Sequence, residues 1–459
     1  MKHTPAMQAT SGESMALIEH VLAFFESLLH NQEPTTSSHS KQGRPVTLEL
    51  AHLWLACLLG LVQQAKGVAD IWRVLTLGPL CSFAAIDVSR QAVRQRLLDT
   101  PLSHLHALLA LVNDALCQRA GLPDALGLAP FAREVVALDE STLDAVARLC
   151  TDVKTLPKDS PILRVGKLAG VFDLRRQCWR RMQFRSDVLA HCKTGALLLL
   201  EDLPKGSLIL ADLGYFCFAT FDYLTQQGYW WLFRLQPKTS YTLLHRFYER
   251  GETLDALIWL GAYRSDQAAH AARLVQFRHQ GVLYRYITNV LDPHQLSMAD
   301  VVRLYARRWD IELAFNVLKK HLGLRLWWGC APHLLLQQIY LTLILAQVLH
   351  HLQQEIAAAA GVDPFDVSVQ VLLKLLRQAR WQCQEGLVPT LLAHARSQHL
   401  IRPHTRHSPQ APLIPAHELV PPPASLPLVR PRRHTINHTP RHPRSTSPFD
   451  FRCIPRWLI

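Results

Sequence analysis

The chain has 459 residues, enough for two or three domains and a substantial core. Hydrophobic residues make up 49% and charged residues 19%, which excludes a chain that is disordered throughout. Lysine and arginine number 49 against 36 acidic residues, and the net charge of +13 favours a polyanionic partner, nucleic acid before a membrane surface.

The cysteines and the apolar segments indicate a cytosolic protein. The ten cysteines show no C-x-x-C pair and no regular spacing, which is typical of reduced core thiols. The N-terminal residues lack the apolar stretch of a signal peptide. The most apolar run, Leu334 to Leu349, is interrupted by three glutamines, so we predict a core helix and no membrane partner.

Residues 1–130 are predicted to form a helical, DNA-binding N-terminal region. Within it, Ser89 is a candidate helix N-cap, and apolar residues follow at four-residue steps. Arg90, Arg94 and Arg96 point away from that apolar seam. The segment resembles the second helix of a helix-turn-helix, which lies in the major groove. A basic helix packed on its neighbours is an equally good interpretation.

Residues 131–235 change to strand-like patterns and are predicted to be the first part of an α/β core. A short apolar run ends at Asp139, two further strands form a hairpin, and a buried strand ends at Asp212. The order of three strands, a helix, a strand, a helix and a strand fits a mixed sheet with an antiparallel edge.

The remaining segments complete the predicted domain organisation. Residues 236–296 alternate in short segments and indicate a β-rich insertion, and residues 297–398 return to helical patterns as the second part of the core and C-terminal helices. The last 59 residues hold 13 prolines and nine arginines against two acids, a net charge of +7. We expect residues 399–459 to be a disordered or polyproline-like tail.

One predicted helix carries a line of reactive side chains. Ser297 with Asp300 forms a capping box and Gly323 is a stop, so a helix of about 25 residues is expected between them. At about 100° per residue, Tyr305, Arg308, Glu312 and Lys319 fall within an arc of about 60°, beside an apolar stripe. A solvated face with an i, i+4 ion pair is the simpler interpretation.

Three carboxylates in this pattern favour a metal site. Asp139 and Asp212 follow strands that we expect to be neighbours, and two carboxylates so placed repel each other unless a cation lies between them. Oxygen ligands alone select Mg²⁺ or Mn²⁺, and Glu312 is the candidate third ligand. Two ions held by three carboxylates suit in-line attack on a phosphodiester, with Arg308 and Lys319 holding phosphates.

Each carboxylate has a rival or a structural alternative. Asp139 and Asp212 are candidates for turn formation, Glu140 or Asp144 could replace Asp139 in the chemistry, and Asp173 also ends a strand, in a hairpin turn. Asp310 is the rival of Glu312, but it lies about 160° around the helix from it.

The signature Y-x2-R-x3-E-x6-K around Glu312 resembles that of the DDE transposases of bacterial insertion sequences, in particular the insertion-sequence-four family. Asp212 with Gly214 and Tyr215 resembles the second acidic motif of that family, and Asp139 the first. Over residues 44–395, this resemblance implies a ribonuclease-H-like catalytic core, dependence on two Mg²⁺ or Mn²⁺ ions, and contacts of Tyr305, Arg308 and Lys319 with DNA.

The resemblance favours a transposase that cuts and joins transposon ends. A metal-dependent nuclease of the same fold and a DNA-binding protein without catalysis, such as a decayed or repurposed copy, are the alternatives. We expect double-stranded DNA as the partner, a homodimer on that DNA, and a bacterial cytoplasmic location at the nucleoid. The tail departs from the family pattern.

Overall fold

The computed structural model of the chain describes residues 15–30, 48–119, 127–143, 166–185, 192–193, 195–262, 267–329, 331–378, 382–383, 386–403, 409–430 and 450–452. Asp144, a rival of Asp139, lies outside these residues.

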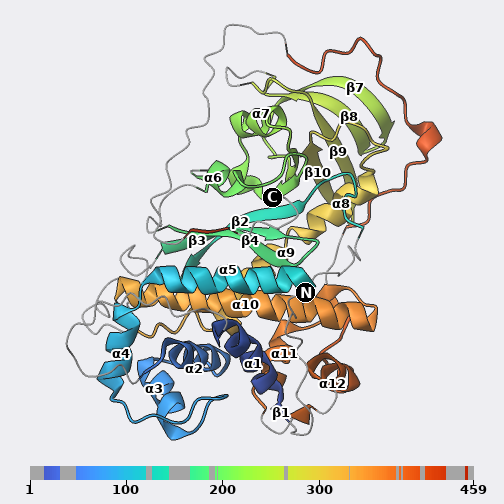
Figure 1. Cartoon of the computed structure of the whole chain (residues 1–459). Helices are drawn as coiled ribbons and strands as arrows, with labels where there is room; N and C mark the ends of the chain where they lie inside the picture. The colour runs from blue at the N-terminus through green and yellow to red at the C-terminus, as the bar shows by residue number, and fades with distance from the viewer. Residues whose placement is uncertain are drawn as a thin grey trace.

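The described chain is built around one large mixed sheet (Figure 1). Its ten strands follow the order β12-β4-β3-β2-β5-β6-β10-β9-β8-β7. The first strands in sequence order are β2 (Val135–Leu143), β3 (Gly166–Asp173), β4 (Cys178–Arg185), β5 (Leu208–Ala211) and β6 (Trp230–Arg234). β2, β3 and β4 are antiparallel to one another, whereas β5 runs parallel to β2, and β6 parallel to β5. The predicted mixed α/β sheet is confirmed.

Side chains of the central strands alternate between two cores, as the period of two in a strand requires. One core includes the long helix α10 (Pro332–Ala360) and receives Val135, Ala137, Leu208 and Leu210. The other includes α6 (Ala196–Leu200) and α7 (Phe218–Gln226) and receives Val136, Leu138, Ile209 and Ala211. Because both faces of β2 and β5 are covered, these strands are continuous apolar runs.

Two long helices lie side by side across one face of the sheet, α10 and α5 (Leu102–Arg119) (Figure 1). α10 is long and apolar enough to cross a membrane, but 89% of its most apolar window is buried inside the protein. Its Gln347 hydrogen-bonds both the N–H and the C=O of Trp179 on β4, at 3.0 and 3.1 Å. α10 is therefore a core helix, as predicted, although it is longer than its apolar run.

Helices of the N-terminal region lie beyond α5 and α10, on the side away from the sheet (Figure 1). They are α1 (Leu17–His30), α2 (Leu50–Val62), α3 (Val68–Leu77) and α4 (Arg90–Asp99), and α11 (Val369–Leu376) and α12 (Leu387–Ala393) lie on the same side.

The structure corrects the helix-turn-helix interpretation of α4. Ser89 caps α4 as predicted, by accepting a hydrogen bond from Ala92 N–H at 3.1 Å. Residues 78–89, all of them described, separate α3 from α4, whereas a helix-turn-helix has a turn of three or four residues. Arg90 and Arg94 are exposed, and Arg96 is half-buried.

The β-rich segment extends the same sheet. β7 (Tyr241–Arg250), β8 (Thr253–Leu260), β9 (Ala272–His279) and β10 (Val282–Thr288) form antiparallel pairs, and β10 pairs with β6. Two further strand pairs involve short segments: β1 (Met15–Ala16) pairs with β11 (Gln382–Cys383), and β12 (Asp450–Arg452) pairs with β4.

Part of the C-terminal tail differs from the expected disorder, because residues 409–430 follow the β-rich segment with their backbone. Val420 N–H donates to Phe247 C=O at 2.8 Å, and Ala271 N–H donates to Leu428 C=O at 2.7 Å. Arg430 lies with its guanidinium 5.1 Å from the ring centroid of Trp259. Backbone hydrogen bonds to a sheet need no apolar composition, which is why the composition of the tail did not reveal them.

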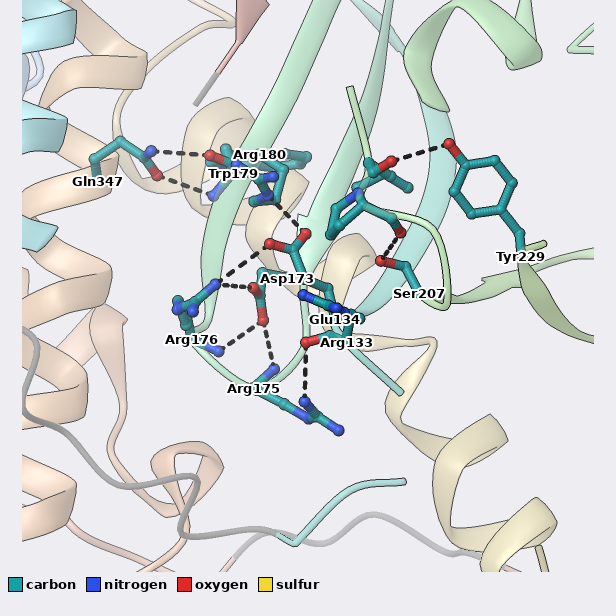
Figure 2. Close-up of polar contacts among 12 residues, drawn as sticks. Arg133, Glu134, Asp173, Arg175, Arg176, Trp179, Arg180, Ser207, Tyr229 and Gln347 are labelled. Carbon is teal, nitrogen blue, oxygen red and sulfur yellow. Dashed lines mark hydrogen bonds and ion pairs between the residues drawn. The ribbon is translucent and has the colours of Figure 1, made fainter. Parts of the chain in front are cut away.

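A buried polar cluster closes the end of the sheet at which β2 begins (Figure 2). Glu134, 1% exposed, accepts from Arg180 Nε at 3.0 Å, and Arg176 lies 3.6 Å from its other oxygen. Arg180 is the extra residue of a β-bulge in β4, and such a bulge redirects a side chain. Asp173 accepts from the backbone N–H groups of Arg175 and Arg176 at 2.8 Å each. It therefore shapes the hairpin turn, which is the role that the sequence indicated as the alternative to metal binding.

Candidate active site

Strand pairing brings Asp139 and Asp212 to the same place. Leu138 of β2 pairs with Ala211 of β5 in parallel register, so an aspartate follows on both strands. By the alternation of these strands, both side chains point to the face that holds α8 (Met298–Arg307) and α9 (Asp310–Asn316). The sequence placed Asp139 at the end of its strand, but β2 continues to Leu143 because β3 still pairs with it there.

A tight turn fixes Asp212 immediately after β5. Its Oδ1 accepts a hydrogen bond from Gly214 N–H at 2.9 Å, which opens the short helical turn Leu213–Tyr215. A Cβ on residue 214 would lie 3.0 Å from that same oxygen and 3.1 Å from Cys192 Sγ. Glycine is therefore favoured here by the close approach of these two side chains, since a larger residue would have to displace them.

The long helix predicted after Ser297 is interrupted. Ser297 caps α8, accepting from Asp300 N–H at 3.1 Å, but a turn at Arg308 and Trp309 separates α8 from α9. The chain then forms a π-helical turn over Val317–His321. A projection at 100° per residue assumes an uninterrupted helix, so the predicted common arc does not extend to Lys319.

Asp139, Asp212 and Glu312 form the acidic group of this site, and Arg308 lies between Asp139 and Glu312. One guanidinium nitrogen lies 2.8 Å from Glu312 Oε1, and another lies 3.6 Å from Asp139 Oδ2. The Arg308 side chain is only 8% exposed, so these contacts are poorly screened by water. Tyr305 lies beside them, with its hydroxyl 3.4 Å from the carbonyl oxygen of Ala211, one residue before Asp212.

The three carboxylates act on one another. The pKa of Asp139 is raised to about 7, chiefly by burial and to a smaller extent by the negative charges of Asp212 and Glu312, against the opposing effects of Glu140 N–H and Arg308. Burial also raises the pKa of Tyr305 to about 12, so its hydroxyl stays protonated. A buried carboxyl group with a raised pKa, next to two further carboxylates, is typical of a functional site.

The donor set suits a hard divalent cation in kind, because it consists of carboxylate oxygens alone. Among the residues that the structure describes, no three Asp, Glu, His or Cys side chains are gathered as a metal-binding group. Glu312 contacts Arg308 through Oε1, and its side chain is 31% exposed.

A cleft opens beside Asp212 with a volume of about 930 Å³. Tyr305 and Arg308 line it, and so do cationic and aromatic residues that the sequence did not single out: Arg234, Tyr284, Tyr286, Trp309 and Arg402. Trp309 is 53% exposed. Cations and exposed rings in one groove are typical of surfaces that bind nucleic-acid strands. The sequence offered one indication of this surface: Tyr284 and Tyr286 are two residues apart in a predicted strand, so both lie on the same face of it.

The other predicted residues lie elsewhere. Lys319 is half-buried in the π-helical turn and does not line the cleft. Arg90 and Arg94 are exposed on α4 in the N-terminal region. Asp310, the rival of Glu312, is 2% exposed and points into the protein. Glu140 faces the opposite side of β2, where Lys167 Nζ lies 2.7 Å from its carboxylate.

Comparisons with known proteins bear on the class of this protein. Residues 163–346 match the family model described as "Transposase DDE domain", a range that includes Asp212 and Glu312 and begins after Asp139. No curated protein matches the chain. A solved structure of the piggyBac transposase synaptic complex with hairpin DNA is similar at 10% identity, covering 85% of this chain and 84% of that one, with a TM-score of 0.38. The domain match supports a DDE transposase.

Proposed function

We propose that this protein is a transposase of the insertion-sequence-four type, which binds the inverted repeats at transposon ends and cuts and joins DNA. The observation that carries the proposal is the set of contacts at Arg308. Arg308 contacts Asp139 from β2 and Glu312 from α9, and Asp212 follows the neighbouring strand, β5. The strand order β4-β3-β2-β5-β6, with its antiparallel and parallel halves, supports a ribonuclease-H-like core for this chemistry.

Asp139, Asp212 and Glu312 are the residues that would hold the divalent cations, Mg²⁺ or Mn²⁺. When bound, such ions activate the attacking oxygen and stabilise the leaving oxygen of a phosphodiester. Arg308, which lines the cleft, would neutralise a phosphate of the bound strand. Tyr305, protonated at neutral pH, is a hydrogen-bond donor in the same cleft.

The reaction has two steps in this proposal. Water attacks the phosphorus at the transposon end, the bond from phosphorus to the 3′-oxygen breaks, and that oxygen takes up a proton. The freed 3′-hydroxyl then attacks a phosphodiester of the target, joins to it and releases a new 3′-hydroxyl. Neither step requires a covalent bond between protein and DNA.

DNA binding in this proposal extends beyond the cleft. Arg90 and Arg94 on the exposed face of α4 contact the end sequence, and the net charge of +13 supplies non-specific attraction. A homodimer on paired ends, and action at the nucleoid in the bacterial cytoplasm, belong to the same proposal.

The test uses the purified protein, Mg²⁺ and labelled duplexes that carry the sequences flanking the coding region, with scrambled duplexes as controls. We expect cleavage at the flanking sequences and transfer of the label to an unlabelled target. Cleavage without transfer would indicate a nuclease instead. End-specific binding without any cleavage would indicate a DNA-binding protein and would overturn the proposal.

The salt dependence and the arginines of α4 provide a second test. Affinity for end DNA should fall steeply with salt concentration, because each phosphate contact releases counterions. Arg90→Ala with Arg94→Ala should weaken end-specific binding more than non-specific binding. An equal loss on both kinds of DNA would reduce the role of α4 to charge alone.

A further inference from the structure

The turn between α8 and α9 has two sides with different partners. Arg308 faces the acidic group, where it contacts Asp139 and Glu312. The residues on either side of the turn, Arg307 and Asp310, are 8% and 2% exposed and contact each other inside the protein. Glu312 lies on α9 two residues beyond Asp310, so the contacts of these two buried residues bear on its position.

Asp310 joins two separate parts of the fold. Its Oδ2 accepts from Arg307 Nε at 3.0 Å, which links the start of α9 to the end of α8. The same oxygen accepts from Gln177 Nε2 at 3.0 Å, which links α9 to the hairpin turn between β3 and β4. A buried carboxylate with two such donors cannot move without leaving polar groups unpaired.

Both partners of Asp310 are themselves held. Arg307 donates to both oxygens of Asp363, at 3.1 and 2.9 Å, and its guanidinium lies 3.9 Å from the ring centroid of Phe365, just beyond α10. Gln177 also donates to Leu174 C=O at 2.9 Å and has φ of +50°, a conformation that needs support from its surroundings.

We propose that Asp310 is a positioning residue that holds the start of α9 so that Glu312 can reach Asp139 and Asp212. The carboxylate anchors the first residue of α9 to the core sheet through Gln177 and to the end of α10 through Arg307. Glu312 follows two residues later on the same helix. This inference rests on the proposed function, because the position of Glu312 matters only if it joins the acidic group in binding cations.

The chain contains a matched control for this idea. Asp300 and Arg303 form an i, i+3 ion pair on α8 at 3.1 Å, the same spacing as Arg307 and Asp310 at 3.0 Å. The Asp300 pair is exposed, with side chains 55% and 40% accessible, whereas that of Asp310 is 0% accessible. Asp310→Asn and Asp300→Asn therefore remove the same charge from a buried and from an exposed pair.

The experiment measures cleavage of end DNA against Mn²⁺ concentration, and Mn²⁺ binding to the DNA-free protein by electron paramagnetic resonance. We expect Asp310→Asn to weaken Mn²⁺ binding and to lower the cleavage rate by about 10- to 100-fold, the usual effect of losing a group that orients metal ligands. End binding should change by less than about twofold, since no DNA-contacting cation is removed. Asp300→Asn should match the wild type in all three measurements.

A second variant separates positioning from folding. Gln177→Leu removes one hydrogen bond to Asp310 and keeps its ion pair with Arg307, so it should shift the Mn²⁺ dependence in the same direction but less. Wild-type Mn²⁺ binding in Asp310→Asn, or a loss of cleavage proportional only to the unfolded fraction, would overturn the inference while the proposed function stands. If the wild type neither binds Mn²⁺ nor cleaves, the proposed function fails, and this inference fails with it.

Discussion

The two ends of β2 both bury carboxylates, but they compensate them differently. Before the strand begins, Glu134 is contacted by Arg176 and Arg180, and Asp173 accepts two backbone N–H groups in addition to Arg176 (Figure 2). Five residues further along, Asp139 shares Arg308 with Glu312 while the charge of Asp212 also acts on it. Burial raises the pKa of Glu134 as well, but an arginine lies beside each of its two oxygens. Asp139 and Glu312 instead share Arg308, with the charge of Asp212 nearby, which favours binding of a cation there.

The largest expected effect is on the proposed cleavage of end DNA, at the end of β2 that carries Asp139. Glu312→Gln keeps the shape of the side chain and removes its charge, so cleavage of end DNA should fall by at least about a thousandfold, since a metal site contributes several kcal/mol to the transition state. Binding of end DNA should persist because Arg308 remains. Glu252→Gln is the control, since Glu252 also pairs with an arginine, Arg278, but on the exposed β-rich segment. Near-wild-type cleavage by Glu312→Gln would show that the acidic group is not the active site.

The next effect concerns stability at the compensated end. Arg180→Ala leaves Glu134 buried with half of its pairing gone, and breaking a buried pair from one side costs about 3–5 kcal/mol. Urea unfolding measures this free energy. If Arg180→Ala leaves the unfolding free energy unchanged, the cluster in Figure 2 does not stabilise the fold, and the comparison between the two ends of β2 fails.

Removing the carboxylate of Asp139, at the other end of β2, should stabilise the protein in metal-free buffer. The pKa of Asp139, about 7 in the folded protein against an ordinary 3.8, means that the folded state favours the protonated carboxyl. The contribution of Asp139 to stability is therefore present below about pH 4 and is lost as the pH rises through 7. Asp139→Asn avoids this loss, so its advantage over the wild type should grow between these pH values to about 4 kcal/mol.

Urea unfolding at a series of pH values, with a chelator present, measures that advantage. Added Mg²⁺ should reduce it, because cations that bind only the folded wild type stabilise it. A constant difference between wild type and variant from pH 4 to pH 8 would contradict the assigned pKa of Asp139.

Local patterns in the sequence predicted more than long-range contacts. The apolar runs before Asp139 and Asp212 predicted two strands, and the capping box at Ser297 predicted the start of α8, because each of these features depends on residues close in sequence. The pairing of β2 with β5 joins residues remote in sequence, and it was expected from the fold class. The break after Arg307 was not predictable from the helical pattern. It accompanies contacts with Gln177 and Asp363, which are remote in sequence.

The same limit explains the error at Lys319. On an uninterrupted helix, Lys319 would share the arc of Glu312, but the turn at Arg308 and the π-helical segment interrupt that helix. Asp310, which the sequence placed on the other side of the helix from Glu312, is buried against Gln177, a contact that no local pattern predicted. The docking of residues 409–430 depends on backbone hydrogen bonds, which composition does not encode.

The smallest expected effect tests whether burial or the number of charges distinguishes the two ends of β2. Arg176 contacts both Glu134 and Asp173, but its side chain is 37% exposed, against 3% for Arg180. After Arg176→Ala, Glu134 still has Arg180, and Asp173 still accepts the backbone N–H groups of residues 175 and 176. The cost in unfolding free energy should be below about 1 kcal/mol, as for other partly exposed ion pairs, and urea unfolding of both variants measures it. If Arg176→Ala costs as much as Arg180→Ala, the stability of the cluster depends on its total positive charge and not on the burial of each arginine. The two ends of β2 would then differ only in how many arginines lie beside their carboxylates.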